Sequence, residues 1–174
     1  MTDITVPIRR VTVTSRRSFD DVAAAVYAGL GRLPDFRSAA ADLATRGDRA
    51  SFDAAVQSQA GRSGLIEFLS LDLGGPVTLR YPDRGRRLLR IIAGNPVTMS
   101  RMAVHVPDAG SYAPVTILIA ERDDGVTLSY DSVASAIAPY GSADASAVAE
   151  ELDAAVLDLL QEAAGPRQRP PLPK

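Results

Sequence analysis

The first thirty residues carry two different hydrophobic patterns. Residues 4–14 alternate between apolar and polar side chains, with one slip midway that is typical of a β-bulge. From Ser18 onward, apolar residues recur every three or four positions as far as Leu33. Serine is a favoured N-cap residue. The pattern therefore predicts a strand over residues 4–14 and a helix over residues 18–33.

The middle of the chain changes from helical spacing to period two. Apolar residues between Phe36 and Leu43 predict one short helix, and Ser51 has the position of an N-cap for another. Residues 65–73 are apolar on both faces, which is typical of a central strand that is covered on both sides, at least in part. After a Gly-Gly-Pro break, residues 77–81 alternate again, so a further strand is predicted there.

A strand, a short helix and a hairpin are predicted next, in that order. Residues 88–93 form an apolar run that is followed by Gly-Asn-Pro at 94–96. Asparagine at the N-cap and proline at the first helical position predict a short helix that ends near His105. Farther on, Asp-Asp-Gly at 123–125 separates two alternating runs. This arrangement predicts a tight β-hairpin.

The two predicted hairpin strands each have an apolar and a polar face. Because side chains alternate along a strand, the residues of one parity share a face with those opposite them. Ser129 and Asp131 take the polar face, whereas Tyr130 falls on the apolar one. The apolar face also carries Val115, Ile117, Ile119, Val126 and Leu128. We therefore expect this face to be part of the core.

The C-terminal part of the chain reads as two helices and a tail. Residues 132–139 predict a short helix, and Ser142 caps a long apolar stripe over residues 143–163. Together the elements predict an α+β fold: a single, mostly antiparallel sheet of four to six strands with helices packed against it. We expect one domain, residues 1–164, and a disordered Pro/Arg tail, residues 165–174.

Composition narrows the classes of function without selecting one. The 174 residues include 19 basic and 21 acidic side chains, which gives a formal net charge of −2. Binding to nucleic acid generally requires a basic excess, so no nucleic-acid partner is expected. The chain has no cysteine and one histidine. This inventory excludes thiolate catalysis and a multi-histidine metal site, and we expect neither a metal nor a cofactor.

The hydrophobic segments are too short for a membrane protein. No apolar run approaches the roughly 18 residues of a membrane span, and the first residues lack the basic and apolar regions of a signal peptide. A cytoplasmic location without a membrane partner is therefore expected.

Several motifs in the second half of the chain occur together in one bacterial family. They are Ile-Ile-Ala-Gly-Asn-Pro at 91–96, Pro-Asp-Ala-Gly at 107–110 with Tyr-Ala-Pro at 112–114, Glu-Arg-Asp-Asp-Gly at 121–125 with Leu-Ser-Tyr at 128–130, and Leu-Asp-Ala at 152–154. On these motifs the chain resembles the family called domain of unknown function 302. The resemblance implies a compact α+β domain that is often dimeric, and it implies no established activity.

Four residues are candidates for acid–base catalysis. Asp72 ends the doubly apolar strand, where its carboxylate faces a cleft or accepts bonds from the amides of the following glycines. His105 can transfer protons near neutral pH or cap its helix at the C-terminus. Tyr130 is a core tyrosine or reaches a pocket with its hydroxyl, and Asp131 faces the opposite way. If these residues form one site, Asp72 is expected to meet Asp131, Tyr112 or His105.

Four further residues are candidates for ligand binding. Tyr112 lies in a predicted loop and Ser129 on the polar face of the hairpin, so both can line a cleft. Arg90 belongs to a basic cluster that can bind an anion or pair with surface carboxylates. Asn95 opens a helix whose free N–H groups can accept an anion.

Three classes of function fit this inventory. The first is a module that binds a small, largely apolar molecule in a pocket between sheet and helices. The second is a metal-free, cofactor-free enzyme of the isomerase or cyclase type that uses acid–base residues. The third is a structural homo-oligomer without catalysis. We expect a homodimer, because one helical layer does not cover both faces of a doubly apolar strand.

Overall fold

One six-stranded sheet organises the fold. The computed structural model describes residues 3–32, 45 and 48–166, and within them the strands follow the order β1-β6-β5-β4-β3-β2. The parallel pair is β2 with β3, and all other neighbours are antiparallel. The strands are β1 (Arg10–Ser15), β2 (Gly31–Arg32), β3 (Ile66–Asp72), β4 (Leu88–Gly94), β5 (Val115–Arg122) and β6 (Gly125–Asp131). The predicted α+β class with one mostly antiparallel sheet is confirmed.

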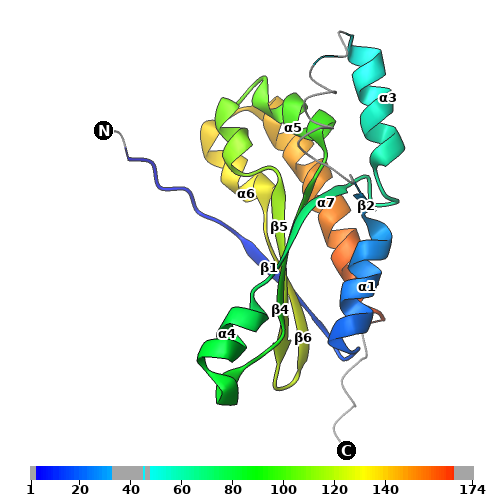
Figure 1. The fold of residues 1–174 in the computed structure, drawn as a ribbon. Helices are drawn as coiled ribbons and strands as arrows, with labels where there is room; N and C mark the ends of the chain where they lie inside the picture. Colours follow the sequence, from blue (N-terminus) through cyan, green and yellow to red (C-terminus); the bar gives the residue numbers. More distant parts are fainter. Residues whose placement is uncertain (1–2, 33–44, 46–47, 167–174) are drawn as a thin grey trace, which may run out of the picture.

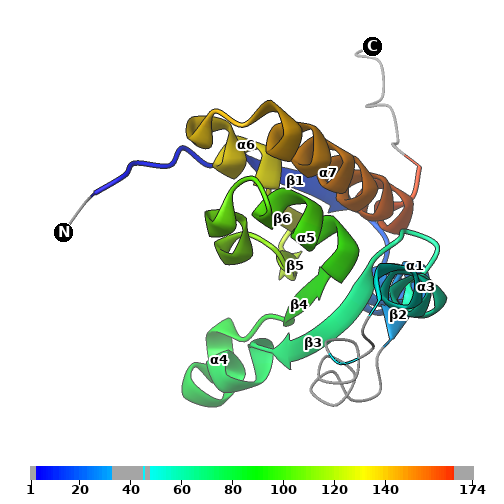
Figure 2. The ribbon, with the colours of Figure 1, turned by 90° about the horizontal axis from the view of Figure 1, so that it is seen from above.

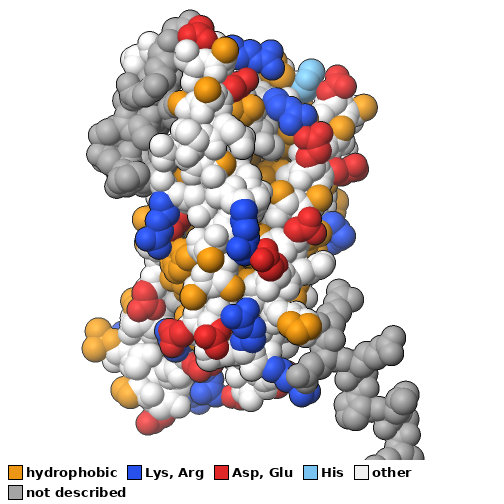
Figure 3. All heavy atoms as spheres, turned by 90° about the vertical axis from the view of Figure 1, so that its right-hand side faces the viewer, with side chains coloured by type: hydrophobic (Ala, Val, Ile, Leu, Met, Phe, Trp, Pro, Cys, Tyr) orange, Lys and Arg blue, Asp and Glu red, His pale blue; other side chains and the backbone are white. Residues whose placement is uncertain are grey.

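The long helices lie on one side of this sheet (Figure 1). Seen from above, α7 runs along β1 and β6, and α1 lies at the β2 end (Figure 2). The helices are α1 (Phe19–Gly29), α3 (Arg49–Gln59), α4 (Gly74–Arg80), α5 (Pro96–Ala103), α6 (Val133–Ile137) and α7 (Ala143–Ala164), with 3-10 turns at Pro82–Arg84, Pro107–Ser111 and Ala138–Tyr140. The outer surface of the helical side carries mixed charges with small apolar groups between them (Figure 3).

Strand register places the core on the covered face. Ile91, Ile117 and Tyr130 lie opposite one another on β4, β5 and β6, and all three are buried. They join one hydrophobic cluster with residues of α1, α5 and α7. Ser129 lies on the other, open face, as the predicted parity of the hairpin requires. That parity is confirmed, since Val115, Ile117, Ile119, Val126, Leu128 and Tyr130 are all buried.

The open face carries exposed leucines of β3. Leu69 and Leu71 are 46% and 36% exposed, so this face of the strand is covered only in part. The ladder shifts between Glu67 and Leu69, and a bulge of this kind changes which side chains face the core. As a result Ser70 and Asp72, rather than the leucines, share the side of Ile91 and Leu89.

The strand predicted over residues 77–81 is a helix instead. Asp72 accepts hydrogen bonds from the backbone N–H groups of Gly74 and Gly75 at 2.8 and 3.1 Å, and these bonds start α4. Proline in the first turn suits a helix, because its missing N–H is not needed there. The alternating apolar residues of this segment do not pack against a sheet, since Leu79 and Tyr81 are exposed.

The N-terminal elements are shorter than their patterns predict. Only residues 10–15 of the predicted strand pair with β6, because β6 ends at Asp131. Arg9, just before them, is hydrogen-bonded to Ser132 and Ser135 instead. Ser18 caps α1 as predicted, but the helix ends at Gly29. The predicted helix between Phe36 and Leu43 lies outside the described residues.

Caps fix the ends of the remaining helices. Asp48, not Ser51, is the N-cap of α3; its carboxylate accepts the N–H of Ser51 at 2.8 Å. The predicted caps Asn95 of α5 and Ser142 of α7 are confirmed. The tight hairpin of β5 and β6 and the short helix after Ser132 are confirmed as well.

Candidate functional site

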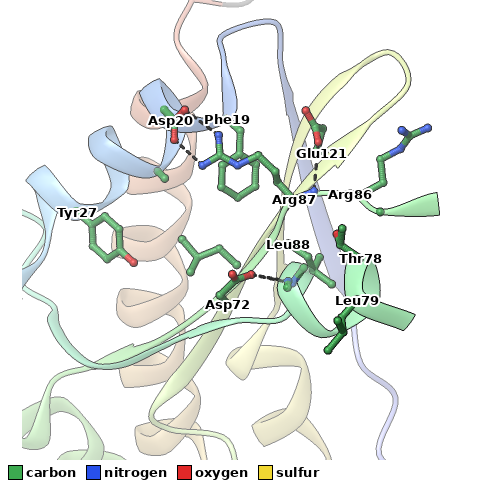
Figure 4. A pocket seen from close by; sticks show the side chains of 15 residues that line it. Phe19, Asp20, Tyr27, Asp72, Thr78, Leu79, Arg86, Arg87, Leu88 and Glu121 are labelled. Carbon is green, nitrogen blue, oxygen red and sulfur yellow. Dashed lines mark hydrogen bonds and ion pairs between the residues drawn. The ribbon is translucent and has the colours of Figure 1, made fainter. Parts of the chain in front are cut away.

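A pocket of about 830 Å³ lies between α1, α4 and the start of β4. Pockets that bind small molecules typically have volumes of about 300–1,000 Å³. Figure 4 shows side chains from these elements converging on it. Its apolar side chains are those of Phe19, Ala23, Leu79, Leu88 and Leu89, and its polar ones include Asp20, Tyr27, Asp72, Thr78, Arg86, Arg87 and Glu121.

Asp72 and the glycines after it form one wall of the pocket. Oδ1 of Asp72 holds the first turn of α4 through Gly74 and Gly75. A Cβ atom at Gly74 would lie 2.6 Å from the carbonyl oxygen of Arg86, so only glycine lets α4 come this close to the strand. Asp72, Gly74 and Gly75 therefore fix both the start of the helix and the edge of the pocket.

Arg87 joins α1 to the start of β4 across the pocket. Its guanidinium binds both carboxylate oxygens of Asp20, at 2.7 and 2.5 Å, and lies 4.3 Å from the centre of the Phe19 ring. These hydrogen bonds lower the pKa of Asp20 and raise the pKa of Arg87. Both groups remain solvent-exposed, so the pair positions α1 more than it stabilises the fold.

Two more carboxylates lie near the same guanidinium. The carboxylate of Glu121 accepts the backbone N–H of Arg87 at 3.2 Å, and the charges of Glu121 and Asp72 both contribute to the raised pKa of Arg87. Arg86, the other cation of the pocket, donates a short hydrogen bond to Asp123 in the hairpin turn. Figure 4 shows Asp20, Asp72 and Glu121 on different sides of Arg87.

A second polar cluster is buried at the other end of the sheet. Asp153 of α7 is 5% exposed and accepts hydrogen bonds from the hydroxyls of Tyr130 and Ser132 and from the N–H of Val133. The guanidinium of Arg9 approaches it to 3.8 Å. Burial, followed by the hydrogen bond to Asp153, raises the pKa of Tyr130. With every member satisfied, this cluster anchors α6 to α7 rather than offering a free site.

Asp153 is a residue that sequence reasoning missed as a site. It belongs to the Leu-Asp-Ala motif and lies on the buried side of α7 together with Leu152 and Val156. A buried aspartate needs several hydrogen-bond donors around it. The position of Asp153 within the apolar stripe of the predicted helix was therefore the signal that could have identified it.

The predicted candidates are divided between two ends of the molecule. Asp72 lies opposite Leu89, near the start of β4, whereas Asn95 follows the far end of that strand and caps α5. His105 and Tyr112 come after α5, at the end where β5 begins. The expected meeting of Asp72 with His105 or Tyr112 therefore does not occur.

His105 and Tyr112 have local partners at their own end. Nδ1 of His105 lies 3.9 Å from a carboxylate oxygen of Asp144, at the start of α7. The hydroxyls of Tyr112 and Tyr140 are 3.1 Å apart. The hydrogen bond between them, together with burial, raises the pKa of Tyr140 to about 12.

Three predicted residues lie on the open face of the sheet. Asp131 forms two hydrogen bonds with Arg10 at 2.7 and 2.8 Å, Arg90 donates to Thr116 at 3.2 Å, and Ser129 lies 3.3 Å from the hydroxyl of Thr12. Asp72 is on the other face and at the other end of the strands, so it does not meet Asp131 either. Of the eight candidates, Asp72 alone lines the pocket.

Two negative findings concern the described residues. No helix among them is long and apolar enough to cross a membrane. Within the same ranges, no three His, Asp or Glu side chains come together in an arrangement that would hold a metal ion.

The fold and the pocket define a small α+β domain with one sheet and one main helical layer. Residues 47–163 match the family model described as Domain of unknown function DUF302, and the chain belongs to this family. The identification made from the sequence motifs is thereby confirmed. No curated protein matches the chain.

A solved structure of the same family has a similar fold. It is the crystal structure of an uncharacterised conserved DUF302 protein from Bacillus stearothermophilus, similar with a TM-score of 0.61 at 7% sequence identity. The match covers 90% of this chain and 98% of that chain. At this identity the similarity shows the fold alone.

Proposed function

We propose that the domain binds a small, largely apolar molecule in the pocket between α1, α4 and β4. The observation that carries this proposal is the pocket itself, about 830 Å³ in volume with Phe19, Leu88 and Leu89 on its walls. Binding sites of this kind combine apolar walls with a few polar groups that fix the orientation of the ligand. Asp72, Thr78 and the Asp20–Arg87 pair supply such groups here.

Binding is a better account of this pocket than catalysis. A general acid or base needs an oriented partner and a proton to exchange, and Oδ1 of Asp72 is already bound to two backbone amides. Asp20 is bound on both oxygens by Arg87. The remaining catalytic candidates lie outside the pocket. The polar groups that line it therefore suit recognition of a ligand more than proton transfer.

A fluorescence titration tests the proposal. N-phenyl-1-naphthylamine is a neutral, apolar dye whose emission rises when it leaves water. We expect saturable binding to the protein and a loss of that binding in Thr78→Trp, where an exposed residue on the pocket wall becomes large. Val77→Trp is the matched control, because Val77 is exposed on the same helix but does not line the pocket. Equal binding by both variants, or no binding by the parent protein, would contradict the proposal.

We also propose that the protein is a homodimer and that the open face of β3 forms the contact. Leu69 and Leu71 are exposed side by side on that face, and no described helix lies over them. A two-fold interface uses the same patch on both copies, so one apolar patch is sufficient. On the polar part of the face, the charges of Arg10 and Asp131 are paired with each other.

Light scattering on a sizing column tests the dimer. We expect the mass of two chains for the parent protein and of one chain for Leu71→Lys, which places a charge on the contact. Val104→Lys is the control, because Val104 is also an exposed apolar residue but lies at the end of α5. A parent protein with the mass of one chain at micromolar concentration would overturn the dimer.

A further inference from the structure

The charges around Arg87 are unbalanced. One guanidinium faces three carboxylates, those of Asp20, Asp72 and Glu121. Asp20 takes both terminal nitrogens of the guanidinium through its two oxygens. The charge of Arg87 is therefore matched by Asp20 alone, and the charges of Asp72 and Glu121 are left over.

Neither of these two remaining carboxylates is paired with a cation of its own in the described part of the chain. Among the described residues, Asp72 accepts only the N–H groups of Gly74 and Gly75, and Glu121 accepts only the N–H of Arg87. Arg86 is the other cation that lines the pocket, and it is bound to Asp123 instead. Backbone donors orient a carboxylate but bring no net positive charge.

These two carboxylates border the apolar walls of the pocket. Leu88 and Leu89 lie between them along β4, because Asp72 is opposite Leu89 and Arg87 is hydrogen-bonded to Glu121. The two negative charges set up an electrostatic field in this part of the pocket, which salt screens because Asp72 is exposed. A bound molecule with a positive head would gain from this field, and a molecule with a negative head would be repelled.

We propose that the pocket selects amphiphilic molecules that carry a cationic amine on an apolar body. The ammonium group would lie beside Asp72 or Glu121, and the apolar body would pack against Phe19, Leu88 and Leu89. This inference rests on the proposed binding function and adds the chemical class of the ligand. It also assigns Asp72 and Glu121 as the residues that determine the charge of the ligand.

Three probes of equal chain length separate the head group from the body. Decylamine, decanol and decanoate are titrated by calorimetry at neutral pH and low salt, below the concentrations at which they aggregate. We expect decylamine to bind about tenfold more tightly than decanol, as one charge-assisted hydrogen bond provides, and decanoate to bind most weakly. The preference for decylamine is expected to shrink as salt is added.

Charge-neutralising variants identify the residues involved. Asp72→Asn removes the charge but keeps an oxygen that can accept the N–H groups of Gly74 and Gly75. Glu121→Gln likewise removes the charge and keeps an oxygen that can accept the N–H of Arg87. We expect each to weaken decylamine binding about fivefold and to leave decanol binding within about twofold. Glu150→Gln, an equal charge change at an exposed position on α7, is the control and should leave both affinities unchanged.

The outcomes separate this inference from the proposed function. If no probe binds, the pocket is not a binding site and the proposed function is wrong. If decanol binds as tightly as decylamine, or decanoate binds best, the pocket stands and the selection for amines is wrong. If decylamine is preferred but neither Asp72→Asn nor Glu121→Gln alters that preference, the assignment of the two carboxylates is wrong.

Discussion

The hydroxyl of Tyr130 on β6 donates a hydrogen bond to Oδ1 of Asp153 on α7, 2.5 Å away. The same carboxylate receives the N–H of Val133, at the first turn of α6. One buried side chain therefore joins the last strand to two helices. It also replaces the water that these polar groups would otherwise need.

Replacing this carboxylate should cost more stability than any exposed substitution. Asp153→Ala leaves the hydroxyls of Tyr130 and Ser132 and the N–H of Val133 without their acceptor, and we expect a loss of about 3 kcal/mol in the free energy of unfolding. Urea denaturation measures it. Asp158→Ala, at an exposed position of the same helix, should change the stability by less than about 0.5 kcal/mol. Similar losses in the two variants would show that the cluster does not anchor α6.

Much of the fold was predictable because local signals agreed with the tertiary structure. The hairpin of β5 and β6 has both a turn sequence and a strict alternation. Asn95 is a strong cap that is followed by proline, and Ser142 is a strong cap that precedes a long apolar stripe. The error at residues 77–81 had a physical origin. The segment alternates with period two, but the hydrogen bonds that Asp72 accepts from Gly74 and Gly75 hold the first turn of a helix there.

Asn95 is predicted to stabilise the fold as the N-cap of α5. Its side-chain oxygen accepts the N–H groups of Val97 and Thr98, and its amide donates to the carbonyl of Gly64 at 2.9 Å. We expect Asn95→Ala to lower the free energy of unfolding by about 1–2 kcal/mol, as the loss of an N-cap does. Asn95→Asp keeps the cap and should lose less. Ligand affinity should be the same in Asn95→Ala, since the residue does not line the pocket.

The hydroxyl of Tyr140 is expected to lose its proton at a higher pH than an ordinary tyrosine. Its pKa of about 12 lies above the ordinary value of 10, so the folded state favours the neutral phenol. The stabilisation from this group is complete below pH 10 and is lost as the pH rises through about 12. Carbon-13 NMR of the tyrosine rings follows the titration. In Tyr112→Phe the main cause of the shift is removed, and the pKa of Tyr140 should fall toward 10; an unchanged value would contradict the role of the hydrogen bond.

Leu79 is predicted to contribute to ligand binding in the pocket and not to the stability of the core. It lines the pocket yet is 86% exposed, so Leu79→Ser should change the stability by less than about 0.5 kcal/mol. Loss of apolar contact with a ligand should weaken the binding of N-phenyl-1-naphthylamine about fivefold. Val104→Ser, at another exposed apolar position, is the control. A variant with parent-like dye affinity would remove Leu79 from the binding surface.

The candidate site was harder to predict from the sequence than the fold, because the site depends on which ends of the strands lie close to one another. Asp72 was identified from its place at the end of an apolar strand, and it does line the pocket. The pairing of Asp20 with Arg87 beside it could not be identified, because these two residues are far apart in the sequence and meet through the packing of α1 against the sheet. Polar residues near one another in sequence, such as His105 and Tyr112, belong to a different end.

The pairing of β1 with β6 joins the first and the last of the described strands in chain order. Arg10 and Asp131 are 121 residues apart, so during synthesis β1 stays without its neighbour until all the residues between them have been made. Closing so long a loop before any of its contacts form is entropically costly and slows folding. We therefore expect the rest of the sheet to assemble first and β1 to be added last, as the edge strand that completes it.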